Sequence, residues 1–301
     1  MAKVALVLSG GGAKGAFQFM AEKYAREVKG YNWEVIAGVS VGALNGVMLA
    51  QKKYQRLEEI WKTISNDQVY TGGLNVWSAI RVAFGAKSFY GNRPLRELIN
   101  RDVEPNKVTV DLRIGVVSLR TGEYATYNAA HPDFKRLVLA STVMPIVWTP
   151  EDISPALQDM IDGGLRNTSP LGDVLDAEPD EVLVINCNPS KAPRMPEPPR
   201  NILDIGRGSL EIALNEILVN DIREFARINE LVRQADEFNR ANNLTDDKRF
   251  VPRKTDGTPF RFYKLTLIEP DEMLDDTLDF SRSAIQRSME RGWEKAKAVL
   301  G

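Results

Sequence analysis

The chain contains 301 residues, of which 43% are hydrophobic and 27% are charged, and its formal net charge at pH 7 is −2. This composition indicates a globular chain long enough for one large core, and it holds no run of the about eighteen apolar residues that a membrane-spanning helix needs. The nearly neutral charge and the absence of a long basic run argue against nucleic-acid partners and against polybasic anchoring to membranes.

The first predicted elements are a buried strand at residues 3–8, a glycine-rich loop at 9–15 and a helix at 16–24. A single lysine ahead of the strand, with no small-residue cleavage site after it, is not the pattern of a signal peptide. Glycines let backbone N–H groups point into one space, and a helix N-terminus adds its own unpaired donors. Such a loop can hold either a phosphate or the negative oxygen of a tetrahedral intermediate.

The second predicted strand, at residues 33–37, runs into a Gly-Val-Ser-Val-Gly sequence centred on Ser40 and then into a helix at 43–51. Gly38 and Gly42 allow the backbone to turn sharply from the strand into the helix. The turn lifts the hydroxyl of Ser40 out of the sheet and onto the positive end of the helix. The sequence therefore predicts that Ser40 is the nucleophile of a nucleophile elbow.

The glycine-rich loop also fits a competing function, because Gly10, Gly12 and Gly15 satisfy the G-x-G-x-x-G pattern of dinucleotide-binding folds. That pattern needs an acidic residue at the end of the second strand to bind a ribose. Here the strand leads into the Ser40 turn, and the nearest acid, Glu34, stands near the start of the strand. An oxyanion hole accounts for both glycine clusters, with a dinucleotide-binding module as the alternative.

The middle of the chain is predicted to contain a helix at residues 54–64, a helix with Pro94 in its first turn, and paired strands at 108–118 and 124–127. Between the two helices, residues 67–92 mix glycines with apolar and aromatic residues. This segment is either a lid or acyl-chain wall, or a core-packing helix with a glycine-rich entry.

The histidine count restricts the mechanism, because a serine hydrolase of the usual kind uses a histidine as its general base. The only histidine of the chain, His131, lies in a polar loop beside Pro132 and just before a predicted helix at residues 134–139. That position is typical of a solvated helix boundary. We therefore expect His131 to be dispensable and another group to take the proton of Ser40.

Asp162 is the candidate for that group, and it ends a short apolar stretch before Gly163 and Gly164. Taken alone, an Asp-Gly pair is also the commonest kind of turn, so a structural role and a catalytic role are both open. An unperturbed aspartate has a pKa of about 3.9, against about 6.5 for histidine. Burial beside Ser40 would raise the pKa of Asp162 and offset part of that difference.

The rest of the chain is predicted to be mainly helical. The single cysteine, Cys187, ends a strand that begins at Glu181; it cannot form an internal disulfide, is expected to pack in the core, and suits a reducing compartment. Further predicted elements are an extended loop with five prolines at residues 188–200, a helix at 202–239, a strand at 260–268 and an amphipathic helix at 281–300. The last helix either packs on its own domain, as such helices usually do, or contacts lipid.

Three motifs in this order and spacing resemble those of the patatin-like phospholipase family. They are the glycine loop at residues 10–15, the turn at residues 38–42 and the Asp-Gly-Gly sequence that begins at Asp162. The block at residues 140–145 is similar to the family's block just ahead of its catalytic aspartate. Together these motifs span most of residues 3–188.

The resemblance implies an α/β fold of patatin type, with three α/β/α layers around a mostly parallel central sheet. It implies a single acyl hydrolase domain over residues 1–301. This domain would consist of a motif-bearing core at residues 3–188 and a mainly helical C-terminal part at residues 201–301.

The resemblance also implies a Ser–Asp dyad that needs no histidine, which agrees with the expectation for His131. Ser40 becomes the nucleophile and Asp162 the general base. The oxyanion hole falls to the backbone N–H groups of the glycine loop: Gly10, Gly11, Gly12, Ala13, Lys14 and Gly15. Lys14 stands where the family often has arginine, and an oxyanion hole built from amides does not require that side chain.

The activity that the resemblance implies is hydrolysis of carboxylic ester bonds in phospholipids or lysophospholipids. A general carboxylesterase, an acyltransferase and an inactive lipid-binding relative are the alternatives. No cofactor, no metal ion and no nucleic acid are expected. The expected location is cytoplasmic, with transient contact with a membrane or micelle surface.

Overall fold

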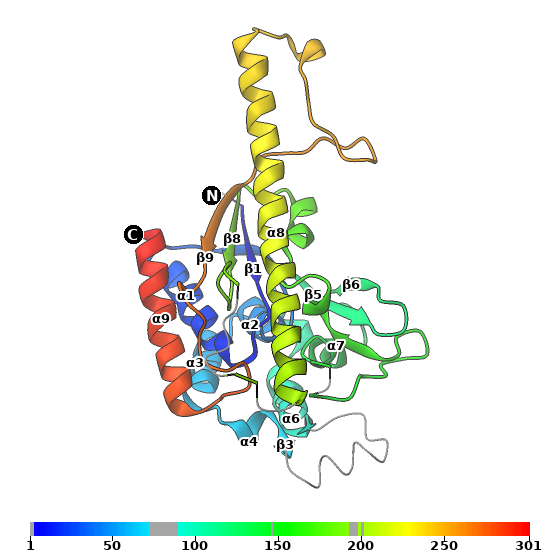
Figure 1. Ribbon diagram of the computed structural model, residues 1–301, viewed down its shortest axis with the longest axis vertical. Helices are drawn as coiled ribbons and strands as arrows, with labels where there is room; N and C mark the ends of the chain where they lie inside the picture. Colours follow the sequence, from blue (N-terminus) through cyan, green and yellow to red (C-terminus); the bar gives the residue numbers. More distant parts are fainter. Residues whose placement is uncertain (1–2, 73–89, 146, 193–197, 200–201) are drawn as a thin grey trace.

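A computed structural model describes residues 3–72, 90–145, 147–192, 198–199 and 202–301 (Figure 1). Its centre is a seven-stranded sheet in the order β6-β5-β2-β1-β8-β9, with β7 paired to β5 outside that path. Most neighbouring strands run parallel, whereas β6 and β7 run antiparallel to β5. The strands are β1 Val4–Leu8, β2 Trp33–Gly38, β5 Asp111–Ser118, β6 Tyr124–Tyr127, β7 Met160–Asp162, β8 Glu181–Ile185 and β9 Lys264–Ile268.

Helices cover both faces of this sheet and give the mixed α/β fold that the sequence predicts. The larger core lies on the face covered by α1 Gly15–Glu27, α2 Val41–Ala50, α3 Tyr54–Thr63, α6 Arg93–Asp102, α7 Phe134–Ala140 and α9 Arg282–Leu300. The smaller core lies on the other face, where α8 Ile202–Ala241 and the short helix η4 Leu171–Ala177 pack.

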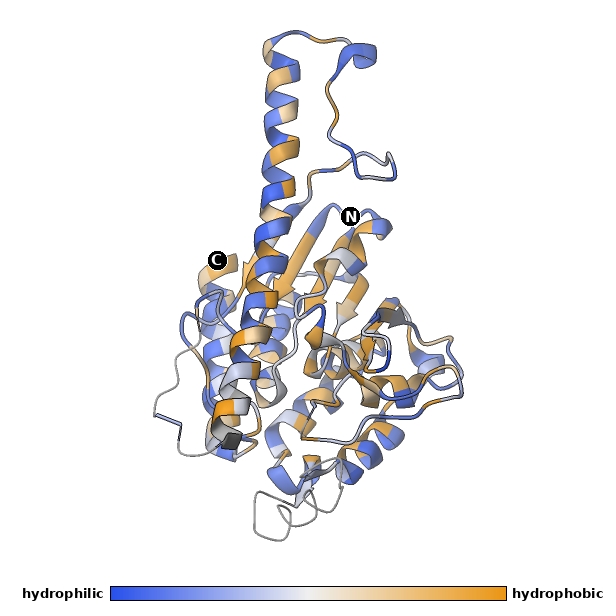
Figure 2. Ribbon diagram, turned by 45° about the vertical axis from the view of Figure 1, so that its right-hand side comes forward, coloured by the Kyte–Doolittle hydropathy of each residue, from blue (hydrophilic) through white to orange (hydrophobic). Residues whose placement is uncertain are grey.

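The alternation of side chains along β1 explains why one strand serves two cores. Successive residues of a strand point to opposite faces, so Leu6 and Leu8 lie in the larger core, and Ala5 and Val7 lie in the smaller one with Phe225 of α8. These four of the five β1 residues are fully buried. Figure 2 shows the central strands as the most continuously hydrophobic part of the ribbon. The apolar run at the start of the chain is therefore a central strand, as predicted.

The helix α8 is the element that extends farthest from the sheet. It contains 40 residues, and its second half projects beyond the strands together with the segment that follows it (Figure 1). Its first half runs beside the sheet, where Leu218 and Phe225 are buried. Among the described residues, no helix combines the length and the apolar character needed to cross a membrane.

The strand predicted at residues 260–268 is shorter in the structure. The alternation at residues 260–268 predicts a strand of nine residues, but β9 contains only Lys264–Ile268. Its neighbour β8 begins at Glu181, which pairs with Lys264, so the residues before Lys264 have no strand beside them in this register. Side-chain alternation can show that a segment suits a sheet, but the length of the neighbouring strand decides how much of it pairs.

Residues 67–92 are described only at their ends. A short helix, α4 Asn66–Val69, precedes β3 Thr71–Gly72, which pairs antiparallel with β4 Tyr90–Gly91. Residues 73–89 lie outside the described residues, so the alternatives of a lid and a core-packing helix stay open. Residues 193–197 and 200 of the predicted proline-rich loop also lie outside the described residues.

Candidate active site

Ser40 lies at the sharp turn between β2 and α2 that the sequence predicts. Its backbone adopts φ 56° and ψ −128°, which a residue with a side chain rarely adopts. The Ser40 N–H donates to the hydroxyl of Ser141 at 3.0 Å, and that hydroxyl donates to the carbonyl of Gly115 at 2.7 Å. A Cβ on Gly42 would lie 2.2 Å from the carbonyl oxygen of Leu8, so the turn can pack against β1 only with glycine there.

Asp162 reaches Ser40 because two strands share one side of β5. Strand β2 pairs with the first half of β5, from Asp111 to Ile114, and β7 pairs with the second half, from Val116 to Ser118. Where β2 ends and turns toward Ser40, β7 therefore takes its place beside β5. Asp162 is the last residue of β7, and its side chain lies beside the nucleophile turn.

The carboxyl group of Asp162 is buried and hydrogen-bonded. Its Oδ1 accepts the N–H of Gly164 at 2.8 Å, and the side chain of Ser40 lies close enough to its carboxylate to favour the charged form. Burial raises the pKa of Asp162 to about 6, and the Ser40 side chain and the Gly164 N–H lower it in part. The predicted rise in this pKa is thus confirmed, and it brings the carboxylate close to the ordinary range of histidine.

The glycine loop between β1 and α1 runs directly against Ser40. A Cβ on Gly10 would lie 3.2 Å from the Cβ of Ser40. Within the loop, four amides already donate to carbonyl oxygens: Gly10 to Thr168, Ala13 to Thr277, Lys14 to Gly11 and Gly15 to Gly12. Among the described residues, no hydrogen-bond partner is found for the amides of Gly11 and Gly12. These two amides are the donors that a ligand beside Ser40 can still use.

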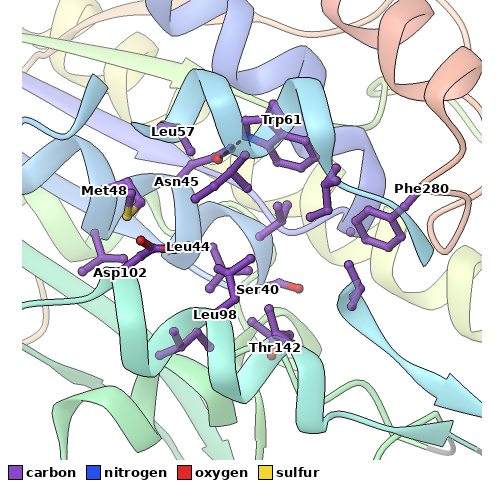
Figure 3. Close-up of a pocket in the computed structure, with 18 of the residues that line it drawn as sticks. Ser40, Leu44, Asn45, Met48, Leu57, Trp61, Leu98, Asp102, Thr142 and Phe280 are labelled. Carbon is purple, nitrogen blue, oxygen red and sulfur yellow. Dashed lines mark hydrogen bonds between the residues drawn. The ribbon is translucent and has the colours of Figure 1, made fainter. Parts of the chain in front are cut away.

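A buried polar network that the sequence patterns did not predict fixes this loop. Gln18 of α1 donates to the carbonyls of Ser9 and Ile185, at 3.2 and 2.9 Å. Asn45 of α2 donates to the Gln18 side chain at 3.0 Å and accepts from the indole of Trp61 at 2.9 Å, as Figure 3 shows for the latter pair. The sequence held one signal for this network: Gln18 and Asn45 stand at helix positions surrounded by apolar residues, and both side chains are buried in the structure.

Two pockets meet at Ser40. The first is a narrow cavity of about 70 Å³ between α2, α3 and α6. Its lining is almost wholly apolar and includes Leu44, Met48, Leu57 and Leu98 (Figure 3). We call it the apolar pocket. Asp102, whose carboxylate accepts two hydrogen bonds from the Arg56 guanidinium at 3.0 and 3.1 Å, also borders it.

The second pocket, which we call the wide pocket, has a volume of about 420 Å³. It lies between the glycine loop, the segment after Asp162 and the first half of α8, which contributes Leu210 and Leu214. Lys14 also lines it; this side chain is buried, and its ammonium donates to the Asn188 side chain at 2.7 Å. The two pockets share Ser40, Met144, Thr277 and Leu278, so the serine hydroxyl stands at their junction.

His131 lies in the loop between β6 and α7, as predicted. Its Nδ1 accepts the N–H of Asp133 at 3.1 Å, and its ring packs edge-on against Tyr127. Of the described residues that line the two pockets, none is His131. The histidine is therefore occupied with the local structure of its own loop.

Two observations bear on binding of a metal ion or a dinucleotide. Among the described residues, no three His, Cys, Asp or Glu side chains are grouped so that they could hold a metal ion. The acid nearest in sequence to the dinucleotide pattern, Glu34, is an exposed residue at the second position of β2. The end of β2, where that pattern requires an acid, is instead the Ser40 turn.

A mostly parallel sheet with a serine on a strand-to-helix turn, a buried carboxylate and a glycine loop beside it places the chain among α/β proteins with a nucleophile elbow. More specifically, it belongs to the patatin-like phospholipase family, whose model matches residues 6–175, more than half of the chain.

Comparison with individual proteins shows more distant similarity. No curated protein matches this chain. Its structure is similar to that of VipD from Legionella pneumophila, with a TM-score of 0.47 and 13% identity, covering 99% of this chain and 66% of VipD. It is also similar to a chain of the heterodimeric ExoU–SpcU complex from the type III secretion system of Pseudomonas aeruginosa, with a TM-score of 0.30 and 16% identity. That match covers 74% of this chain and 51% of the other, so this chain spans only part of either structure.

Proposed function

We propose that this chain is a lipid acyl hydrolase that cleaves carboxylic ester bonds of phospholipids or lysophospholipids through an acyl-Ser40 intermediate. Membership of the patatin-like phospholipase family supports the reaction class. The observation that carries the proposal is the placement of the buried Asp162 carboxylate beside the Ser40 side chain, in the lining of one pocket. A nucleophile and its base within hydrogen-bonding distance are what acyl transfer to serine requires.

In the first half of the reaction, Asp162 accepts the proton of Ser40 while the serine oxygen attacks the ester carbonyl. A pKa near 6 makes this carboxylate a stronger base than an exposed aspartate, whose pKa is about 3.9. The carbonyl oxygen becomes negative and accepts hydrogen bonds from the amides of Gly11 and Gly12. The C–O bond to the alcohol then breaks, and protonated Asp162 gives its proton to the leaving alkoxide.

In the second half, Asp162 takes a proton from water, and the resulting nucleophile attacks the acyl ester on Ser40. The tetrahedral oxygen again faces Gly11 and Gly12. Collapse releases the fatty acid and returns the proton from Asp162 to the Ser40 oxygen. Serine and aspartate therefore end in their starting protonation states, and the cycle needs no metal ion or cofactor.

The two pockets suit different parts of the substrate. The apolar pocket offers almost no polar group to a ligand, which suits an acyl chain. The wide pocket is larger and is lined by Lys14, Asn188 and Asn215 as well as by apolar residues, which suits the glycerol and head-group part. Ser40 at their junction would face the ester bond between the two parts.

The test is labelling with a fluorophosphonate probe, followed by mapping of the modified residue by mass spectrometry. Wild-type protein should be labelled on Ser40, and Ser40→Ala should be neither labelled nor active. Hydrolysis should then be compared on phosphatidylcholine vesicles, lysophosphatidylcholine micelles and a short-chain p-nitrophenyl ester. Activity confined to the short-chain ester would point to a general carboxylesterase, and labelling without turnover of any ester would contradict a hydrolase.

A further inference from the structure

Thr168 connects three parts of the active site. It lies between the short helix η3 Gly163–Leu165 and η4, and it is 4% exposed. Its carbonyl accepts the N–H of Gly10 in the glycine loop at 3.2 Å. Its hydroxyl donates to the carbonyl of Gly164 at 2.7 Å and lies 3.2 Å from the carbonyl of Leu214 on α8. The side chain of Thr168 thus contacts the aspartate loop and α8, and its backbone carbonyl contacts the glycine loop.

The contact to Gly164 matters because Gly164 also holds the carboxylate of Asp162. The Gly164 N–H donates to Asp162 Oδ1 at 2.8 Å. A residue whose carbonyl is fixed by Thr168 and whose N–H binds the carboxylate has little freedom to rotate. The hydroxyl of Thr168 therefore restricts the position of Asp162 through a single intervening residue.

The hydrogen bond from the Gly10 N–H to the Thr168 carbonyl holds the glycine loop, on the other side of the site. The Gly10 residue packs against Ser40 and directly precedes Gly11 and Gly12, whose amides face the reacting oxygen in the proposed mechanism. The neighbouring Ser169 N–H donates to the carboxylate of Asp221 on α8 at 3.1 Å, which gives the same segment a second attachment to α8. The segment at Thr168 and Ser169 is therefore held from both sides.

We propose that Thr168 is a positioning residue: its hydroxyl group, through Gly164, holds the Asp162 carboxylate in place relative to the oxyanion loop, which the Thr168 backbone carbonyl holds at Gly10. This inference rests on the proposed Ser40–Asp162 mechanism. Threonine fits the role because its hydroxyl reaches Gly164 while its methyl group fills a buried space. Valine has nearly the same shape without the donor, and serine keeps the donor without the methyl group.

The experiment compares Thr168→Val with Thr168→Ser. Thr168→Val should lower kcat about tenfold, the size expected for loss of one positioned hydrogen bond, with KM within about twofold of wild type. Thr168→Ser should restore most of kcat. Looser binding of Asp162 by Gly164 should also raise the pKa of the carboxylate, so the acid limb of the kcat/KM profile should move to higher pH in Thr168→Val.

Thr266→Val is the matched control. Thr266 lies on β9, and its hydroxyl donates to Glu181 at 2.8 Å, away from both pockets. This variant should change the melting temperature without moving kcat or the acid limb. If Thr168→Val does not fold, Thr168→Ala removes the same hydroxyl without placing a methyl group against the carbonyls of Gly164 and Leu214, and it should give the same kinetics.

Three results would overturn the inference: wild-type kcat in the variants that lack the hydroxyl, no rescue by Thr168→Ser, or an unmoved acid limb with a loss no larger than that of the control. Failure of the proposed function is recognised separately, because Asp162→Asn would then keep its activity. If Asp162→Asn is inactive and Thr168→Val is fully active, the positioning role of Thr168 is rejected and the proposed function stands.

Discussion

Ser40 and Asp162 reach the same site by different structural routes. Ser40 stands on a continuous strand, turn and helix, so local backbone geometry places it. Asp162 ends a strand of three residues, and it lies beside Ser40 because β7 takes over from β2 along β5. The comparison teaches that the place of Ser40 is fixed by its neighbours in sequence, and that of Asp162 by the order of strands in the sheet.

Asp162→Asn gives the sharpest test of this difference and the largest expected effect. Asparagine keeps the size of the side chain and an acceptor for Gly164 but removes the base, so kcat should fall at least about 10²-fold with KM little changed. Measurement of kcat on the preferred ester checks this. Near-normal turnover with a lower melting temperature would show that Asp162 only shapes its turn.

The same variant should be more stable to heat than the wild type at alkaline pH. The pKa of Asp162 is raised from 3.8 to about 6 in the folded protein, so the folded state binds the proton more tightly than the unfolded state. Stability contributed by this proton is full below about pH 4 and is lost as the pH rises through about 6. At pH 8, Asp162→Asn should therefore melt a few degrees above wild type, whereas at pH 4 the two should nearly coincide.

The pH dependence of wild-type activity should follow the same group. Because the base must be ionised, kcat/KM should fall below about pH 6, by about tenfold for each further pH unit. A profile from pH 4 to 9 with a denaturation control at each pH measures this limb. A limb near pH 4 would mean that Asp162 titrates like an exposed carboxyl group and is not the buried base.

Ser141→Ala tests the other route, through the backbone of Ser40. It removes the acceptor of the Ser40 N–H and the donor to Gly115, leaving buried polar groups unpaired at a cost of about 1–3 kcal/mol. We expect kcat to fall about tenfold, with fluorophosphonate labelling of Ser40 slowed by a similar factor. Unchanged labelling would show that β2 and α2 hold the turn without Ser141.

His131→Ala should have the smallest effect. The histidine binds within its own loop, so kcat should stay within a few-fold of wild type, whereas loss of a true general base costs about 10²–10⁴-fold. Comparison of kcat for this variant and for Asp162→Asn on one substrate is the measurement. A loss of the larger size would restore a histidine mechanism and remove the reason for assigning the base to Asp162.

The sequence by itself determined the elements on either side of the site. The apolar run before the glycine loop, and the glycines around Ser40, act over a few residues, and their predicted strands and helices occur in the structure. The Ser40 turn was predictable for the same reason, because Gly38 and Gly42 stand two residues on either side of Ser40 and allow the sharp change from strand to helix.

Only the tertiary structure decided which distant groups meet. The replacement of β2 by β7 beside β5, the network of Gln18 and Asn45, and the contacts of Thr168 all join segments far apart in the chain. The sequence could not decide which loop amides remain available, because those of Gly10 and Ala13 are taken by carbonyls of Thr168 and Thr277. Local patterns fix dihedral angles and faces, whereas strand order and long-range hydrogen bonds depend on how the whole chain packs.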